Sequence, residues 1–218
     1  MGRLVFRSLF FLVALAACGQ NIARQPDHSE TLHLAKPAIY LYPEKAIDVT
    51  VKLKLDGQLV GTYPELDPVT GAWNVVAYPD GSMLDKLDGR KYSYLFWEGD
   101  SGAFAIDFSS GFVVAGSDVR PFFRKTLTKL GLSASEINDF IVYWYPVLRN
   151  NPYNLIHFAG KEYRRVAHLE ISPQPDTELR VFMTYRALDS PIVVSAQKIA
   201  PLVRRGFTVV EWGGAGVK

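Results

Sequence analysis

The sequence predicts an α+β fold that is mainly antiparallel β-sheet, sandwich-like in its N-terminal part, with two or three short helices in the middle. Residues 38–115 hold several short runs in which apolar and polar residues alternate, separated by Gly, Pro and Asp turns. Helix-capping residues appear from residue 117, and strand-like alternation returns after residue 166. About 180 residues suit one hydrophobic core, so we expect a single globular domain over residues 36–214.

The clearest strand of the N-terminal part covers residues 47–55. Apolar residues occupy its odd positions, and Asp, Thr and Lys occupy the even ones. Asp56-Gly57 predicts a tight hairpin into a second strand at residues 59–63. Further strands are expected at residues 73–78, 92–97 and 104–108. This spacing is typical of an antiparallel sandwich or barrel-like sheet.

Two helices are predicted in the middle of the chain. The first covers residues 117–131, with a serine at its N-terminus and a glycine after its last turn. The second begins at the capping box of Ser133 and Glu136. Residues 140–145 fit a helical stripe as well as a strand. We predict a buried strand there, because the run is β-branched and aromatic and Pro146 would break a continuing helix; Pro146 would then begin a brief helix.

The C-terminal third is predicted to be β-structure again. Residues 166–172 and 178–187 are expected to pair as a hairpin. In one register, one face of this hairpin pairs apolar residues, and the other face pairs Glu170 with Arg180. A last strand is expected at residues 207–212, before a glycine-rich tail.

Residues 1–17 are predicted to be a signal peptide. Two arginines precede an apolar stretch that is shorter than the ~20 residues of a membrane-spanning helix. The segment Leu15-Ala16-Ala17-Cys18 resembles a lipobox, which implies cleavage before Cys18 and acylation of that residue. Cys18 is the only cysteine in the chain, so we expect no disulfide in the exported domain.

The charge balance of the chain changes when the signal peptide is removed. The net charge of +2 comes from its two arginines, since taking two from the 24 basic residues leaves 22 against 22 acidic ones. A neutral mature chain gives no support for nucleic-acid binding. Residues 18–35 are polar and are predicted to be a flexible tether between the domain and its lipid anchor. Gly19 after Cys18 resembles lipoproteins of the outer membrane, so we expect a periplasm-facing anchor where two membranes exist.

Five blocks of the sequence carry a resemblance to a known family. They are Lys36–Pro43 (KPAIYLYP), Ala77–Gly81 (AYPDG), Tyr92–Gly99 (YSYLFWEG), Phe140–Pro146 (FIVYWYP) and Gly206–Gly214 (GFTVVEWGG). In this order they resemble a family of uncharacterised bacterial exported proteins and lipoproteins. The resemblance implies a single domain in the cell envelope. It implies no activity, no cofactor and no site residue.

Two glutamates, each next to a tryptophan, are the strongest candidates for chemistry. Glu98 follows Trp97 and Glu211 precedes Trp212, and each pair ends a predicted strand before a glycine. Loops after strand ends commonly present functional groups. Two carboxylates can hydrolyse a glycosidic bond if they lie about 5–5.5 Å or 6.5–9.5 Å apart. The more common interpretation is structural, with the tryptophans in the core and the glutamates in turns or ion pairs.

Other chemistries have little support in the sequence. Gly99–Gly102 (GDSG) resembles the nucleophile motif of chymotrypsin-like proteases, but the preceding histidines, His28 and His33, lie in or next to the tether. We therefore expect a β-turn there. No metal site and no cofactor are expected, because the four histidines form no helical i,i+4 pair and no phosphate-binding glycine motif occurs.

The aromatic content is the remaining indication of function. Tyrosine and tryptophan combine an apolar body with a polar tip, which suits binding surfaces as well as cores. The tyrosines at positions 40, 42, 63, 78, 92, 94, 143 and 145 could line a groove for a glycan or a peptide. Our leading hypothesis is a non-catalytic, membrane-anchored module that binds an envelope component, such as a glycan or a protein partner, through an aromatic surface with Trp97, Trp144, Trp212 and Tyr94. One alternative is a glycan-active hydrolase that uses Glu98 and Glu211. Another is a structural or assembly lipoprotein with no ligand site.

Overall fold

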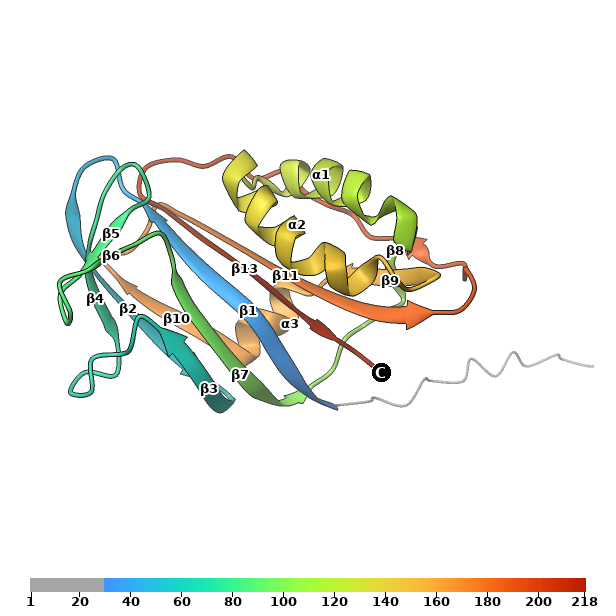
Figure 1. The fold of residues 1–218 in the computed structure, drawn as a ribbon, viewed down its shortest axis with the longest axis horizontal. Coiled ribbons are helices and arrows are strands. Elements are labelled where there is room, and N and C mark those ends of the chain that lie inside the picture. Colours follow the sequence, from blue (N-terminus) through green and yellow to red (C-terminus); the bar gives the residue numbers. More distant parts are fainter. Residues whose placement is uncertain (1–29) are drawn as a thin grey trace, which may run out of the picture.

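Strand β1 (Glu30–Tyr42) lies near the middle of the larger of two sheets, between β13 (Thr208–Gly216) and β7 (Leu95–Phe104). The computed structural model describes residues 30–218, so the predicted signal peptide, Cys18 and most of the predicted tether lie outside the described residues. The predicted class is confirmed, because antiparallel strands dominate the described part of the chain and three α-helices accompany them there (Figure 1).

The larger sheet has eight strands in the order β12-β8-β9-β11-β13-β1-β7-β3. Its other members are β3 (Gly57–Tyr63), β8 (Ser110–Ala115), β9 (Tyr153–Phe158), β11 (Thr177–Leu188) and β12 (Ser195–Ala196). Only the pairs β11–β13 and β12–β8 are parallel among the described strands. The smaller sheet is antiparallel and has the order β10-β2-β4-β5-β6. It contains β2 (Ile47–Leu55), β4 (Trp73–Ala77), β5 (Met83–Asp85), β6 (Lys91–Tyr92) and β10 (Ala167–Ser172).

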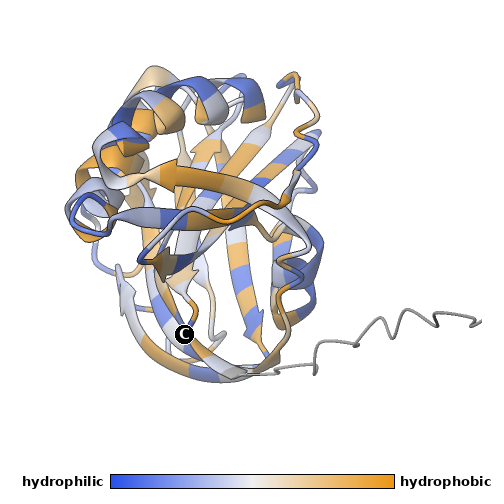
Figure 2. Cartoon of the chain, turned by 90° about the vertical axis from the view of Figure 1, so that its right-hand side faces the viewer, coloured by the Kyte–Doolittle hydropathy of each residue, from blue (hydrophilic) through white to orange (hydrophobic). Residues whose placement is uncertain are grey.

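The two sheets face each other across one hydrophobic core, which we call the inter-sheet core. It contains Trp73 of β4, Trp97 of β7 and Phe182 of β11, all fully buried. The alternation in β2 explains its place, since Val49 and Val51 face this core. Figure 2 shows this alternation of hydrophobic and hydrophilic residues along the strands. The short helix α3 (Gly160–Val166) closes the same core with Tyr163.

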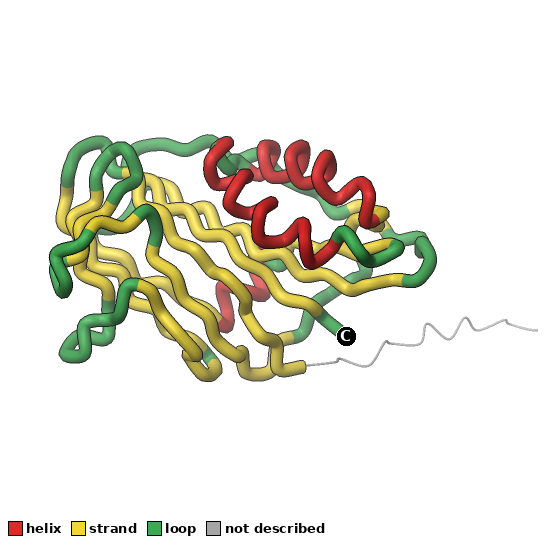
Figure 3. Tube along the Cα trace, in the orientation of Figure 1, coloured by secondary structure: helices red, strands yellow, loops and turns green. Residues whose placement is uncertain are grey.

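A second core lies on the opposite face of the larger sheet, under α1 (Val119–Leu130) and α2 (Ala134–Leu148). A short 3₁₀ turn (Gly116–Asp118) leads into α1. As predicted, Gly131 ends α1 in the left-handed conformation (φ 99°), and Ser133 with Glu136 forms a capping box on α2. The two helices cover the half of the sheet that runs from β8 to β1 and leave β7 and β3 uncovered on that side (Figures 1 and 3).

The predicted strand at residues 140–145 is wrong, because α2 continues through it to Leu148. Phe140, Trp144 and Leu148 recur every four residues and are all buried against the sheet. Pro146 lies in the last turn of α2, where the carbonyl that it leaves unbonded belongs to the exposed Val142. Burial of a continuous apolar stripe therefore outweighs local strand propensity and the proline.

Both predicted hairpins are wrong for a shared reason. Strand β10 pairs with β2, whereas β11 pairs with β9 and β13 in the other sheet. Likewise β2 and β3 belong to different sheets, so Asp56-Gly57 carries the chain from one sheet to the other. Glu170 consequently pairs with Lys54, and Arg180 turns into the inter-sheet core. A strand with alternating residues can bury its apolar face beside many different neighbouring strands. The alternation alone therefore does not determine which strand it pairs with.

The predicted tether ends earlier than expected. Residues 30–35 are part of β1, where Leu34 pairs with Gly99 of β7. Leu32 and Leu34 are both buried in the inter-sheet core, and this burial outweighs the polar residues around them. Within residues 30–218, no helix is both long and apolar enough to cross a membrane.

Candidate functional site

The glutamate pair expected from the sequence does not exist, because Glu98 and Glu211 lie on opposite faces of the larger sheet. Trp97 points into the inter-sheet core, where its Nε1 donates a hydrogen bond to Glu211 Oε1 at 3.0 Å. Glu98 follows Trp97 on the same strand and so points to the other face. There its Oε1 accepts a hydrogen bond from the backbone N–H of Lys36 at 3.3 Å. A whole sheet separates the two carboxylates, so they cannot act together on one glycosidic bond.

Glu211 is instead one half of a buried ion pair. Its Oε2 lies 2.6 Å from Arg180 Nε, and both side chains are almost completely buried. Arg180 also donates from Nη1 to the carbonyl oxygen of Ala167 at 2.7 Å. Its guanidinium lies over the ring of Tyr163, 4.7 Å from the centroid. Burial raises the pKa of Tyr163 well above its ordinary value, so its phenol stays neutral. These contacts are those of an internal structural cluster.

The three tryptophans that were expected to anchor a ligand are core residues. Trp97 and Trp212 are fully buried, and Trp144 is 2% exposed. The glycines next to Trp212 explain part of this packing. A Cβ at Gly214 would lie 2.7 Å from Cζ2 of Trp144, and one at Gly213 would lie 3.1 Å from Pro37. The expectation that these tryptophans form a surface is therefore wrong, and the glycines serve close packing rather than a ligand.

Tyr94 is the one expected binding residue that reaches the surface, and it belongs to a larger group of rings. We call this group the aromatic strip: Tyr63, Tyr92, Tyr94 and Phe96. Phe96 of β7 pairs with Tyr63 of β3 and with Ala38 of β1, so the side chains of all three residues share the helix-side face. The rings of Tyr63 and Tyr92 meet edge to face, with 5.3 Å between their centroids. Phe96 and Tyr63 lie on β7 and β3, the strands that α1 and α2 leave uncovered on this side (Figure 1), whereas Tyr92 belongs to β6 of the smaller sheet and Tyr94 lies between β6 and β7.

The ammonium group of Lys36 lies against the aromatic strip. Its Nζ donates a hydrogen bond to Tyr94 Oη at 3.0 Å and lies 4.4 Å and 5.1 Å from the ring centroids of Tyr94 and Phe96. An ammonium over two ring faces is stabilised by their quadrupoles. The same contact leaves Lys36 half-buried and fixes the position of its charge.

The backbone of Lys36 has a strained conformation. Lys36 is the only described non-glycine residue with positive φ, at 56°. It precedes Pro37, and β1 bulges here relative to both of its neighbours, between Ala35 and Ala38 on the β13 side. Such a conformation costs about 1–3 kcal/mol, and strain of this kind concentrates at functional sites. The sequence carries no signal for this bulge beyond the Lys-Pro dipeptide.

Helix α2 forms a wall beside the strip. Burial and the nearby Glu98 carboxylate raise the pKa of the Tyr143 phenol, which therefore stays neutral. Tyr40 donates a hydrogen bond to Asp139 Oδ2 at 3.0 Å and packs its ring 5.5 Å from that of Tyr94. Burial raises the pKa of Tyr40 strongly, and Asp139 adds to this effect. The site therefore combines neutral aromatic groups with the Lys36 cation and with two carboxylates, Glu98 and Asp139.

The five sequence blocks that carry the family resemblance meet around β1. The blocks from Lys36, Tyr92 and Gly206 form neighbouring strands of the larger sheet, and the block from Phe140 is α2, which packs on them. The remaining block contains Gly81, where a Cβ would lie 2.6 Å from the ring of Tyr42 in β1. The blocks therefore contribute Tyr92, Tyr94 and Phe96 of the strip and part of the core beneath it.

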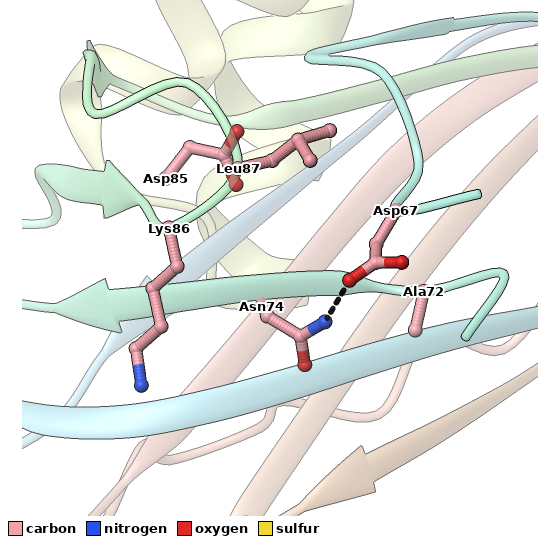
Figure 4. A pocket seen from close by; sticks show the side chains of 6 residues that line it. All are labelled: Asp67, Ala72, Asn74, Asp85, Lys86 and Leu87. Carbon is pink, nitrogen blue, oxygen red and sulfur yellow. Dashed lines mark hydrogen bonds between the residues drawn. The ribbon is translucent and has the colours of Figure 1, made fainter. Parts of the chain in front are cut away.

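A small pocket in the smaller sheet has a different character (Figure 4). It has a volume of about 150 Å³ and is lined by Asp67, Ala72, Asn74, Asp85, Lys86 and Leu87. Asp67 accepts hydrogen bonds from the backbone of Val69 and Thr70, and Lys86 pairs with Asp48. Burial raises the pKa of the Asp85 carboxyl. Pockets for organic ligands measure about 300–1,000 Å³, and within residues 30–218 no group of three potential metal ligands occurs.

One comparison with known proteins finds a relative. Over 97 residues the chain is 36% identical to an uncharacterised protein encoded in the bglA 3′ region of Butyrivibrio fibrisolvens, an alignment that covers 44% of this chain and 92% of that protein. No family model matches the chain. No solved structure matches it.

Proposed function

The chain belongs to the same family as the uncharacterised Butyrivibrio fibrisolvens protein, and we propose that it is a lipid-anchored protein of the bacterial envelope that binds a glycan through the aromatic strip. The observation that carries this proposal is the strained Lys36, whose ammonium is held against Tyr94 and Phe96 on an uncovered sheet face. A strained residue persists only where the surrounding structure holds it in place, and such residues concentrate at ligand sites.

The residues of the strip suit a sugar polymer. Aromatic rings pack against the apolar faces of pyranose rings, and tyrosine hydroxyls add hydrogen bonds at the edge. Lys36 and Glu98 supply one donor group and one acceptor group for sugar hydroxyls. Phe96 and Tyr63 are paired on neighbouring strands, with Tyr63 at the sheet edge, and this open arrangement favours an extended ligand over a small enclosed one.

The proposed anchor depends on Cys18. The apolar stretch before it and its place after Leu15-Ala16-Ala17 support lipidation. Several acyl chains hold a protein on a membrane much more firmly than one, at about 0.8 kcal/mol per buried methylene. With this anchor the protein would work at a membrane surface that faces envelope glycans.

Glycan binding can be tested by co-sedimentation of the full-length protein, in detergent, with insoluble peptidoglycan. We expect Tyr94→Ala and Tyr63→Ala each to weaken binding by up to about tenfold, as loss of an aromatic contact of 0.5–1.5 kcal/mol predicts. Tyr153→Ala is the matched control, because Tyr153 is a partly exposed tyrosine at the far end of the sheet. Equal binding by all four proteins would refute the proposal. Binding to a co-purifying protein instead, lost with Tyr94→Ala, would assign the strip to a protein partner.

The anchor has its own test. Wild-type protein expressed with a fatty-acid probe should be labelled, and Cys18→Ala should remain unlabelled. Undiminished labelling of Cys18→Ala would refute the lipobox interpretation without touching the glycan proposal.

A further inference from the structure

Strand β3 is the open edge of the larger sheet. Six of its seven residues pair with β7 on one side, and no described strand pairs with the other. Val60 has no partner on β7, because β3 bulges between Leu59 and Gly61. The side chain of Val60 is 58% exposed, and those of Leu59 and Tyr63 are also exposed. An edge of this length presents unpaired backbone groups together with apolar side chains.

The other described sheet edges are short or charged, whereas β3 is neither and carries only a bulge. Natural edges are commonly short or carry charged side chains, which prevents pairing with another chain. Strand β12 and strand β6 have only two residues each, and β10 carries His168 and Glu170. Strand β3 has the sequence Gly-Gln-Leu-Val-Gly-Thr-Tyr and no charge at all. Apart from the bulge at Val60, this edge therefore lacks the features that prevent pairing with another chain.

We propose that β3 pairs antiparallel with β3 of a second copy of this chain, with a two-fold axis at Val60. In that register Gln58 faces Thr62, and Leu59 faces Gly61 of the other copy. The flanking Asp56 faces Pro64, so no like charges oppose each other. An isologous contact needs this self-complementarity, and an uncharged strand provides it.

The size of the contact indicates where the dimer forms. A seven-residue strand is about 23 Å long, and one such pair buries less than the roughly 1,200 Å² of a stable interface. Anchoring of both copies in one membrane raises their effective concentration. This inference therefore rests on the proposed lipid anchor. A two-fold axis perpendicular to the sheet keeps both aromatic strips on the same face, where two Tyr63 side chains lie near the junction.

Cysteine cross-linking tests the contact in membranes that hold the full-length protein. At the two-fold axis the Cα atoms of two copies of residue 60 would lie about 4.5–5.5 Å apart, which a disulfide spans. On mild oxidation we expect Val60→Cys to give at least fivefold more covalent dimer than Val69→Cys. Val69 is the matched control, because it is 91% exposed in a turn of the other sheet. Equal yields, or a Val60→Cys adduct with a different protein, would overturn the proposal.

The proposed lipid anchor and the proposed dimer can be refuted independently. The wild-type chain should give no covalent dimer, because a lipidated Cys18 has no free thiol. Dimer in the wild-type chain would show that the anchor has failed. Val60→Cys and Val69→Cys are then compared in a Cys18→Ser background at increasing protein concentration. A fivefold higher yield of covalent dimer for Val60→Cys supports β3 pairing, and equal yields refute it.

Discussion

Trp97 and Glu211 come from strands on either side of β1, and Trp97 Nε1 donates to Glu211 Oε1 at 3.0 Å inside the protein. The same carboxylate holds Arg180. Glu211, a candidate catalytic residue in the sequence, therefore links three strands inside the protein. The polar and aromatic groups at the surface lie on the other face of the sheet, around Lys36 and Tyr94.

The first prediction concerns this buried pair. Glu211→Leu should destabilise the protein by about 3–5 kcal/mol, because Arg180 would keep an uncompensated charge in the core. Urea unfolding followed by tryptophan fluorescence measures the change. Lys54→Ala is the control, since it removes an exposed ion pair with Glu170 that is worth about 0–1 kcal/mol. Similar losses in both variants would contradict the structural role of Glu211.

The second prediction concerns the close approach of α2 to β13. Gly214→Ala should destabilise the fold by about 1–3 kcal/mol, because the new Cβ would lie 2.7 Å from the Trp144 ring and 2.5 Å from the Met183 carbonyl oxygen. Gly160→Ala should be nearly neutral, because nothing lies within 4 Å of a Cβ there. Thermal unfolding of the two variants separates these outcomes, and an unchanged Tm for Gly214→Ala would refute the packing argument.

The third prediction concerns the strain at Lys36. Lys36→Gly should be more stable than Lys36→Ala by about 1 kcal/mol, because glycine adopts positive φ without steric cost. Both variants lose the ammonium over Tyr94, so both should bind the glycan more weakly than the wild type. Chemical denaturation and the co-sedimentation assay measure the two effects. Equal stability of the variants would show that the backbone is not strained.

The fourth prediction concerns the tyrosine at the end of the strip. A hydrogen bond to the Asp88 carboxylate raises the pKa of Tyr92 to about 12. Because the folded pKa lies above the unfolded value, the stabilisation is complete below pH 10 and is lost as the pH rises toward 12. Ultraviolet titration of the phenolates should show that Asp88→Asn moves one tyrosine back toward pH 10. An unchanged titration curve would show that this hydrogen bond does not form.

Sequence patterns of a few residues correctly predicted the helix ends that are fixed by a capping box or a glycine. The capping box at Ser133 and the glycine stop at Gly131 formed as expected, because caps satisfy backbone groups within a few residues. The alternation in β2 also formed as expected, since charged and apolar residues sort between water and core wherever the strand is placed. Residues 140–145 did not, because the choice between helix and strand depended on the sheet that covers Phe140 and Trp144.

The candidate site was only partly predictable. The density of aromatic residues pointed to Tyr94 and Tyr63, whereas nothing in the sequence singled out Phe96 and Lys36. Their contact depends on the register of β1, β7 and β3, which come from distant parts of the chain. It depends also on where α1 and α2 end, because these helices bury the rest of the same face.

The sequence by itself determined the fold class, the glycine stop of α1, the capping box of α2 and the two faces of β2, since periodicity and capping are local properties of the backbone. Only the tertiary structure decided which strands pair, which carboxylate is buried and which rings remain at the surface. Strand alternation is satisfied by many partners, and the free-energy differences among them come from packing over the whole core. For that reason Glu211 and Trp212 are buried, whereas Lys36 and the aromatic strip lie at the surface of the sheet.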